Sequence, residues 1–170
     1  MVLGPDLWAL RAFQTAVRAA GLEPVSSYVS LTEVSEYAKG MPEVRLRDRL
    51  NPRLPPEGKR AFCFYPMSKR RGEVHNWYAT AYEERKELML GHGKTGREFA
   101  GRVLQLITGS TGVDEYEWGV TLFAVHPDDL KEVVYTMRFD EASARFAEFG
   151  PFYTGIVGEI EEVLGLLALR

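Results

Sequence analysis

His92 is the side chain with the clearest potential for chemistry, because glycine stands on both sides of it. Gly91 and Gly93 lack side chains, so a flat ligand can approach the backbone around the imidazole closely. The other two histidines, His75 and His126, lie in a polar loop and at an expected helix start. No Cys/His or His/carboxylate cluster has the spacing of a closed zinc site. From the residues alone, His92 is either a structural histidine or the axial ligand of a haem, whose porphyrin supplies four nitrogens itself.

A second group of reactive side chains lies upstream, where an apolar stretch leads into the sequence FYPMSK at residues 64–69. A tyrosine can relay an electron and a proton, and a lysine can hold a carboxylate. The aromatic pair Trp77-Tyr78 follows shortly afterwards. Taken in isolation, Tyr65 is typical of a strand end, Lys69 of a solvated turn and the aromatic pair of core packing. These residues therefore need a wider context before they indicate a function.

The composition describes a folded protein and argues against several classes of partner. The 170 residues are 45% hydrophobic and 26% charged, which is enough for one sizeable domain. A formal charge of −3 with scattered basic residues gives no case for nucleic acid. The lone Cys63 excludes an intramolecular disulfide. No apolar run is long enough to span a membrane, and residues 1–6 lack the features of a signal peptide, so we expect a cytoplasmic location.

The pattern from residue 60 predicts the order β-α-β-β-α-β, which is the ferredoxin-like unit. We expect one complete domain over residues 60–158 and a C-terminal helix within 159–170, ending near Leu169. The helix after the first strand has a capping-box signature, Thr80 followed by Glu83. The expected elements are strands over 60–66, 103–108, 116–125 and 148–157 (broken by Pro151), and helices over 80–90, 127–137 and 159–169.

The N-terminal part predicts only a portion of such a unit. A helix over 6–20, with Asp6 as N-cap and Gly21 at its end, precedes a strand over 25–37. Residues 38–59 are rich in Gly and Pro and predict a loop, with the linker itself at 41–59. Residues 1–40 thus look like the remnant of a first ferredoxin-like repeat. One strand cannot cover the apolar stripe of the helix, so we expect an N-terminally shortened form of a longer protein.

Three ordered motifs, YPMSK at 65–69, NWY at 76–78 and HGKTGR at 92–97, resemble the coproheme decarboxylases. These enzymes are the haem-synthesis branch of the chlorite dismutase-like family, and the resemblance covers roughly residues 25–157. It implies an α+β fold of the dimeric α+β-barrel kind, with an antiparallel sheet, helices on one face and a homopentameric assembly. It also implies decarboxylation of iron-coproporphyrin III (coproheme) to haem b with hydrogen peroxide as oxidant. The bound porphyrin would be both substrate and redox cofactor.

The resemblance also implies a role for individual residues. Tyr65 matches the redox-active tyrosine, and His92, 27 residues later, matches the proximal iron ligand. Lys69 matches a lysine near a reactive propionate, and Met67 a residue that lines the same pocket. Gln105 matches the distal residue.

Further matches concern the four propionates of coproporphyrin, two more than haem b carries. Such a pocket must supply several donors, and arginine offers a bidentate one. Ser143 matches a propionate-binding serine, and Tyr28 and Arg49 match a tyrosine and an arginine that hold propionates. Glu141 is considered as an orienting partner of the proximal histidine.

Two alternatives remain at this point. The first is a chlorite dismutase or a general haem peroxidase, but the dismutases carry arginine where this chain has Gln105, and a neutral amide stabilises a distal oxyanion less. The second is a non-catalytic haem-binding oligomeric module. The combination of Tyr65, Lys69 and His92 argues against that second reading.

Overall fold

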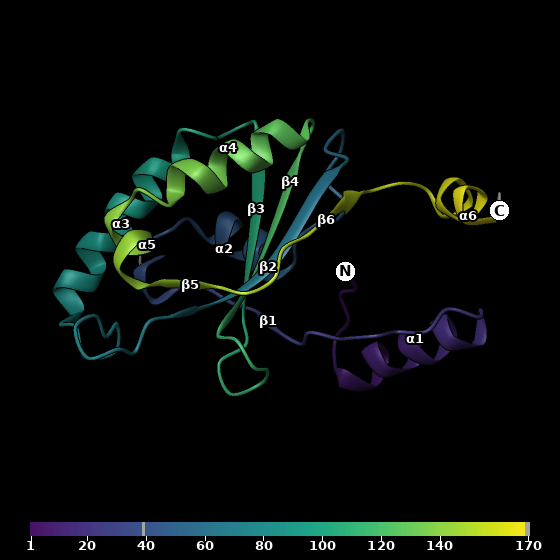
Figure 1. The fold of residues 1–170 in the computed structure, drawn as a ribbon, viewed down its shortest axis with the longest axis horizontal. Coiled ribbons are helices and arrows are strands. Elements are labelled where there is room, and N and C mark those ends of the chain that lie inside the picture. Colours follow the sequence, from purple (N-terminus) through teal and green to yellow (C-terminus); the bar gives the residue numbers. More distant parts are fainter. Residues whose placement is uncertain (39, 169–170) are drawn as a thin grey trace.

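A computed structural model describes residues 1–38 and 40–168 of the chain. Within these residues, six strands form one sheet, and α3, α4 and α5 gather on one side of it, as Figure 1 shows. The helices are α1 (Leu7–Ala19), α2 (Glu43–Leu50), α3 (Tyr82–Arg97), α4 (Pro127–Met137), α5 (Glu141–Phe146) and α6 (Ile160–Ala168), with a short 3-10 turn η1 (Glu36–Ala38). The strands are β1 (Leu31–Thr32), β2 (Ala61–Lys69), β3 (Val103–Gly109), β4 (Trp118–Ala124), β5 (Ala147–Phe149) and β6 (Tyr153–Ile156).

The sheet is antiparallel, with the order β1-β3-β4-β2-β5, and β6 also pairs with β2. From β2 onward the chain follows the expected β-α-β-β-α-β order, with β5 and β6 together making the last strand. The predicted α+β ferredoxin-like class is therefore confirmed. The register aligns Tyr65 with Val120 and Val120 with Ile107, so these three side chains share one face of the sheet.

The helix-facing side of the sheet carries the larger core cluster. Side chains alternate along a strand, so Cys63 and Tyr65 of β2 point to the same side and meet Leu130 and Val133 of α4. The cluster consists of Ala61, Cys63, Tyr65, Phe99, Val120, Leu122, Ala124, Leu130 and Val133. A smaller cluster holds α3 to α5 and consists of Trp77, Leu88, Ala142 and Phe146.

The strand β2 runs further than expected. The sequence predicted its end at Pro66, but the ladder with β4 continues to Met67, and Lys69 still pairs with Ala147 of β5. Proline cannot donate a backbone hydrogen bond. Here the neighbouring strand is interrupted between β5 and β6 beside Pro66, and the Pro66 carbonyl accepts a bond of 2.8 Å from the Gly150 N–H. The missing donor is therefore tolerated.

The helix α3 also extends beyond its expected end. It reaches Arg97 rather than residue 90, so His92 lies inside the helix and not at its glycine-flanked terminus. The capping box is wrong as well. The N-cap is Ala81, without a side-chain cap, and the Thr80 hydroxyl donates to the Asn76 carbonyl at 2.8 Å instead.

The N-terminal third departs most from the sequence-based expectation. The helix is confirmed, since Asp6 caps α1 by accepting from the Ala9 N–H at 2.8 Å, and Gly21 ends it with φ +85°. The strand expected over 25–37 is wrong except for β1, which pairs with β3. The expected loop 38–59 contains α2, and residue 39 lies outside the described residues.

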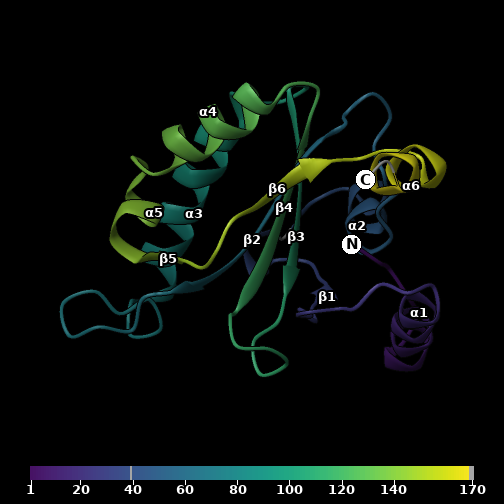
Figure 2. The same ribbon diagram turned by 45° about the vertical axis from the view of Figure 1, so that its right-hand side comes forward.

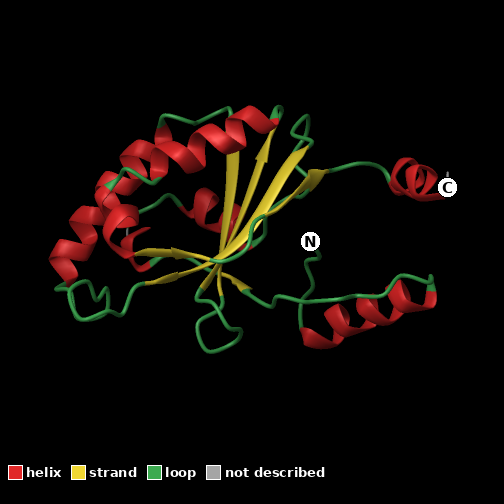
Figure 3. Ribbon diagram, in the orientation of Figure 1, coloured by secondary structure: helices red, strands yellow, loops and turns green. Residues whose placement is uncertain are grey.

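The terminal helices α1 and α6 stand apart from the sheet and its covering helices (Figures 2 and 3). α6 confirms the expected C-terminal helix as far as Ala168, while Leu169 lies outside the described residues. Large apolar side chains on both helices are exposed, among them Trp8 and Ile160. None of the described helices has the length and apolar character that crossing a membrane requires.

Gly150 provides a test of the close packing around Pro66. A methyl group at this position would lie 2.8 Å from Pro66 Cγ and 2.7 Å from Tyr116 Cζ, so at least one ring must shift to admit it. We expect Gly150→Ala to lower the free energy of unfolding by about 1–3 kcal/mol in urea denaturation. Gly155→Ala is the matched control because nothing lies within 4 Å of the added carbon. Equal effects of the two substitutions would contradict this packing.

Candidate active site

Tyr65 and Lys69 lie on the helix-facing side of β2, four residues apart, with Met67 between them. Tyr65 is only 7% exposed, and its ring stacks on Phe152 at 4.5 Å and meets Phe149 edge-on at 5.7 Å. Burial raises the pKa of Tyr65 above its ordinary value, so the phenol keeps its proton at neutral pH. No described residue hydrogen-bonds to the hydroxyl. The group is therefore a protonated, unpartnered phenol at a strand surface.

Lys69 is almost buried, at 8% exposure, although it carries an ammonium group. Its Nζ lies 4.5 Å from the centroid of the Trp77 ring, a cation–π contact. Burial lowers the pKa of Lys69 to about 8, against the opposing influence of Asp140 and Glu117. Within the described residues, no carboxylate forms an ion pair with Nζ. The ammonium is thus desolvated and its hydrogen-bond donors are available to an incoming anion.

His92 faces the N-terminus of α5 from α3. Its Nδ1 lies 3.1 Å from Asp140 Oδ2 and 3.5 Å from the Ser143 hydroxyl. Burial alone would raise the pKa of Asp140, but hydrogen bonds from His92 and Ser143 outweigh it and hold that pKa below its ordinary value. An Nδ1–H donated to the carboxylate leaves the lone pair on Nε2, to which no described residue hydrogen-bonds. That nitrogen is free to ligate a metal.

Asp140 performs two tasks with its two carboxylate oxygens. Oδ1 accepts from the backbone N–H groups of Ala142 and Ser143 and so caps α5, while Oδ2 holds His92. The sequence reasoning missed this residue and considered Glu141 instead, which pairs with Arg145 at 2.9 Å. An aspartate directly before Glu141-Ala142-Ser143 is an N-cap signal that could have found it.

Gln105 lies on the same side of the sheet as Tyr65 but two strands away. It aligns with Leu122, which aligns with Cys63, one step along the face from Tyr65. Strand geometry separates the Gln105 and Tyr65 positions by about 12 Å. Gln105 is exposed, and Ile107 beside it is 39% exposed, so this part of the face is not covered by a helix. A flat ligand can lie across it.

The structure does not bring every expected residue to this place. Tyr28 packs on Phe64, at 5.4 Å between centroids, which puts it on the opposite face from Tyr65, and its hydroxyl is bonded to Ser110. Arg49 is exposed on α2, and no hydrogen bond or ion pair joins it to the residues above. Ser143 is close, but its hydroxyl faces His92. The structure thus places Tyr28 on the other face of the sheet from Tyr65, and a propionate-holding role stays a prediction for Tyr28, Ser143 and Arg49.

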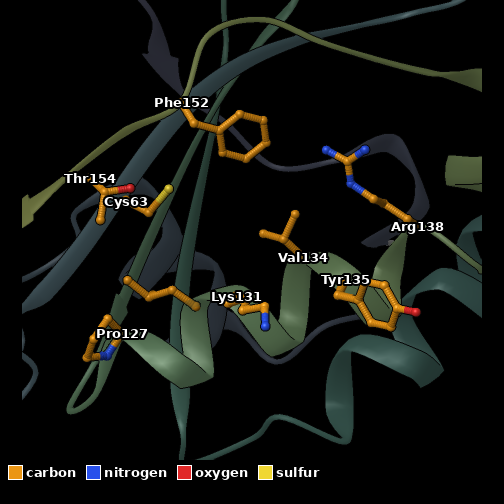
Figure 4. A pocket seen from close by; sticks show the side chains of 9 residues that line it. Cys63, Pro127, Lys131, Val134, Tyr135, Arg138, Phe152 and Thr154 are labelled. Atoms are coloured by element: carbon orange, nitrogen blue, oxygen red, sulfur yellow. The ribbon is translucent and has the colours of Figure 1, made fainter.

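Two hollows flank these residues. One of about 470 Å³ opens beside His92 between α3 and α5, and its lining carries charges of both signs, including Glu87, Lys94 and Arg145. The other, of about 360 Å³, lies between α4 and the β2–β6 edge, with Phe152, Val134 and Arg138 around it (Figure 4). Phe152 links that second hollow to Tyr65 through their ring stack.

The geometry and topology together define a class: a ferredoxin-like α+β protein with a carboxylate-held histidine on one helix and a buried lysine and tyrosine on the sheet. The sequence matches the family model described as chlorite dismutase over residues 1–158. The chain therefore belongs to the chlorite dismutase family, as the motifs indicated.

The chain is similar to several members of this family but spans only part of their length. It is 44% identical to a coproheme decarboxylase of Staphylococcus saprophyticus, over 98% of this chain and 70% of the relative. It is 48% identical to a candidate haem-binding protein of Natronomonas pharaonis, over 94% of this chain but only 28% of that relative. A solved haem-binding protein of Thermus thermophilus superposes with a TM-score of 0.88 at 41% identity, covering 97% of this chain and 68% of that one.

Because Asp140 both caps α5 and holds His92, its removal should lower the free energy of unfolding. Asp140→Ala loses the α5 cap and the bond to His92, so we expect the free energy of unfolding to fall by about 1–3 kcal/mol. Asp6→Ala removes an equivalent cap from α1, which buries no residue, and should leave the main unfolding transition unchanged. Chemical denaturation of both variants checks this. Similar losses in both, or none in Asp140→Ala, would refute the assignment.

Proposed function

We propose that this chain carries the active site of a coproheme decarboxylase, which converts iron-coproporphyrin III to haem b with hydrogen peroxide. The observation that carries the proposal is the buried, anion-free ammonium of Lys69 on the same strand face as Tyr65. A porphyrin site with only iron and hydrophobic contacts would not need a desolvated cation, whereas a reactive propionate does. The staphylococcal relatives named coproheme decarboxylase support this reading.

The residues present fit an iron porphyrin with propionates. Nε2 of His92 is available for the iron, and its orientation is set through Nδ1 by Asp140. The uncovered face around Gln105 and Ile107 offers an apolar and amide surface for the distal side of a flat ring. Lys69 offers the cation for one propionate. No group of three or more His, Cys, Asp or Glu that could hold a bare metal ion occurs in the described part of the chain, which suits an iron whose other ligands come from a porphyrin.

Oxidative decarboxylation removes two electrons from each of the two reacting propionates. A propionate, one hydrogen peroxide and one proton give a vinyl group, one carbon dioxide and two waters. A bound iron porphyrin would supply the redox chemistry that draws on the peroxide. Tyr65 gives up its phenolic hydrogen and then takes a hydrogen atom from the propionate β-carbon, while Lys69 holds the carboxylate that leaves as carbon dioxide.

The environment of Tyr65 suits such a relay. Because burial keeps the phenol protonated, the hydroxyl always carries the hydrogen that must move. Since no described residue hydrogen-bonds to it, the hydroxyl can turn toward the substrate. Phe149 and Phe152 hold the ring in place and shield it from water.

Gln105 favours this reaction over chlorite dismutation, since a neutral amide offers less stabilisation to a chlorine oxyanion than arginine would. Hydrogen peroxide as oxidant, a homopentameric assembly and a cytoplasmic location belong to the same proposal. They come from the family resemblance, and the exposed apolar faces of α1 and α6 are compatible with an assembly.

When purified protein is mixed with ferric coproporphyrin III and then with peroxide, two propionates of the porphyrin should become vinyl groups in sequence, seen as two losses of product mass. Tyr65→Phe should bind the porphyrin, because it loses no hydrogen bond of the free protein, and should convert it at least about 100-fold more slowly. The control is Tyr135→Phe, which removes a hydroxyl from a 63% exposed ring on α4 and should react normally. Unchanged mass in the wild type would refute the function, and full turnover in Tyr65→Phe would refute the relay.

His92→Ala tests the iron ligand independently of turnover. The variant should keep its fold, bind ferric porphyrin at least about tenfold more weakly and lose the absorption spectrum of histidine-ligated iron. His126→Ala is the control, because His126 is the N-cap residue of α4 and lies apart from Asp140 and Ser143. If the spectrum survives in His92→Ala, the ligand is one of the other two histidines.

A further inference from the structure

Glu117 is a buried carboxylate that the proposed reaction does not use. It is 5% exposed and lies directly before β4. Its Oε2 accepts from the backbone N–H of Lys69 at 2.7 Å, and its own N–H donates to the Met67 carbonyl at 3.1 Å. Burial and the nearby Glu117 carboxylate raise the pKa of the Tyr78 phenol. Glu117 is therefore hydrogen-bonded to the backbone at the end of β2, at Met67 and Lys69.

The hydrogen bond to the Lys69 N–H does not require a charged acceptor. A glutamine side chain could accept the same backbone N–H through its carbonyl oxygen. Burying a charged carboxylate instead is costly unless a nearby cation compensates it. One such cation is the ammonium of Lys69, on which Glu117 acts electrostatically.

The charge acts across a gap rather than through an ion pair. In the described part of the chain, neither Glu117 nor Asp140, the other acid acting on Lys69, comes within ion-pair distance of Nζ. A direct pair would have to be broken before a substrate carboxylate could bind. At a longer distance, the acids favour the charged form of the lysine and leave its three N–H donors free.

We propose that Glu117 is a positioning residue for Lys69, which fixes the backbone of the lysine and keeps its ammonium charged without occupying it. The importance of this for catalysis rests on the proposed function, because Lys69 would hold the reacting propionate. Charged and titratable groups around this place are Glu117, Tyr78, Asp140 at the start of α5, Arg85 over the Trp77 ring, and Arg71, which acts on Tyr78. Glu117 is the one among them that contacts the lysine backbone.

The test measures the lysine itself in the porphyrin-free protein. Acetic anhydride labels neutral amines, so the labelling of Lys69 against pH, read by peptide mass spectrometry, gives its apparent pKa. Glu117→Gln keeps the hydrogen-bond acceptor and removes the charge. Burial is then less opposed, and we expect the apparent pKa of Lys69 to fall by at least about half a unit. Glu115→Gln, at an exposed acid two residues away, should leave it unchanged.

The rate of coproheme decarboxylation is then measured against pH for the same variants. Because the ammonium is lost as the pH rises through its pKa, the alkaline limb of decarboxylation should move to lower pH in Glu117→Gln and stay in place in Glu115→Gln. An unchanged labelling pKa in a folded Glu117→Gln protein overturns the proposal. A shifted labelling pKa in a protein that never decarboxylates coproheme leaves the role of Glu117 standing and refutes the proposed function instead.

Glu117→Asp covers the case in which Glu117→Gln does not fold. Shortening the side chain by one methylene keeps the charge and withdraws it from Lys69. The labelling pKa should then fall by less than in the amide variant but in the same direction. A pKa equal to that of the wild type would overturn the proposal.

Discussion

The site depends on one physical constraint: among the described residues, the ammonium of Lys69 is buried without a carboxylate paired to it. Transfer of Lys69 out of water disfavours its charge, and the Trp77 ring with the distant carboxylates of Glu117 and Asp140 compensates only part of that cost. A ligand carboxylate would complete the compensation. The desolvation that weakens the free protein would therefore strengthen binding of a propionate, and it favours a porphyrin with a carboxylate at this one position.

The fold places Lys69 there through an irregularity in β2. A strand ending at Pro66 would have left the lysine in a solvated turn. The ladder instead continues because the neighbouring strand is interrupted beside the proline and Gly150 bonds to its carbonyl. The period of two along a strand then brings Tyr65 and Lys69 to one face. The position of the two reactive groups is a consequence of this single break between β5 and β6.

Elements with strong local signals could be predicted from the sequence. α4 begins and ends where Pro127 and its apolar stripe indicate. Residues 25–37 have a strand-like composition, but only Leu31 and Thr32 pair with the sheet, while the Val29 N–H donates to the Asp114 side chain. α3 runs through three glycines that argue for an end, because α4 and α5 pack along it. In both places tertiary contacts override local preference.

The residues proposed to react could be named from sequence motifs, whereas their partners in the fold could not. Glu117 lies 48 residues from Lys69, and Asp140 lies 48 residues from His92, so only the folded chain joins them. Asp140 orients the imidazole of His92 and also acts on the charge of Lys69. His92 and Lys69, the residues proposed for the iron and for a propionate, are therefore both influenced by the charge of Asp140. A change in the α5 cap would alter the surroundings of both side chains. This short helix, which the sequence did not predict, would then link iron ligation to substrate recognition in the proposed function.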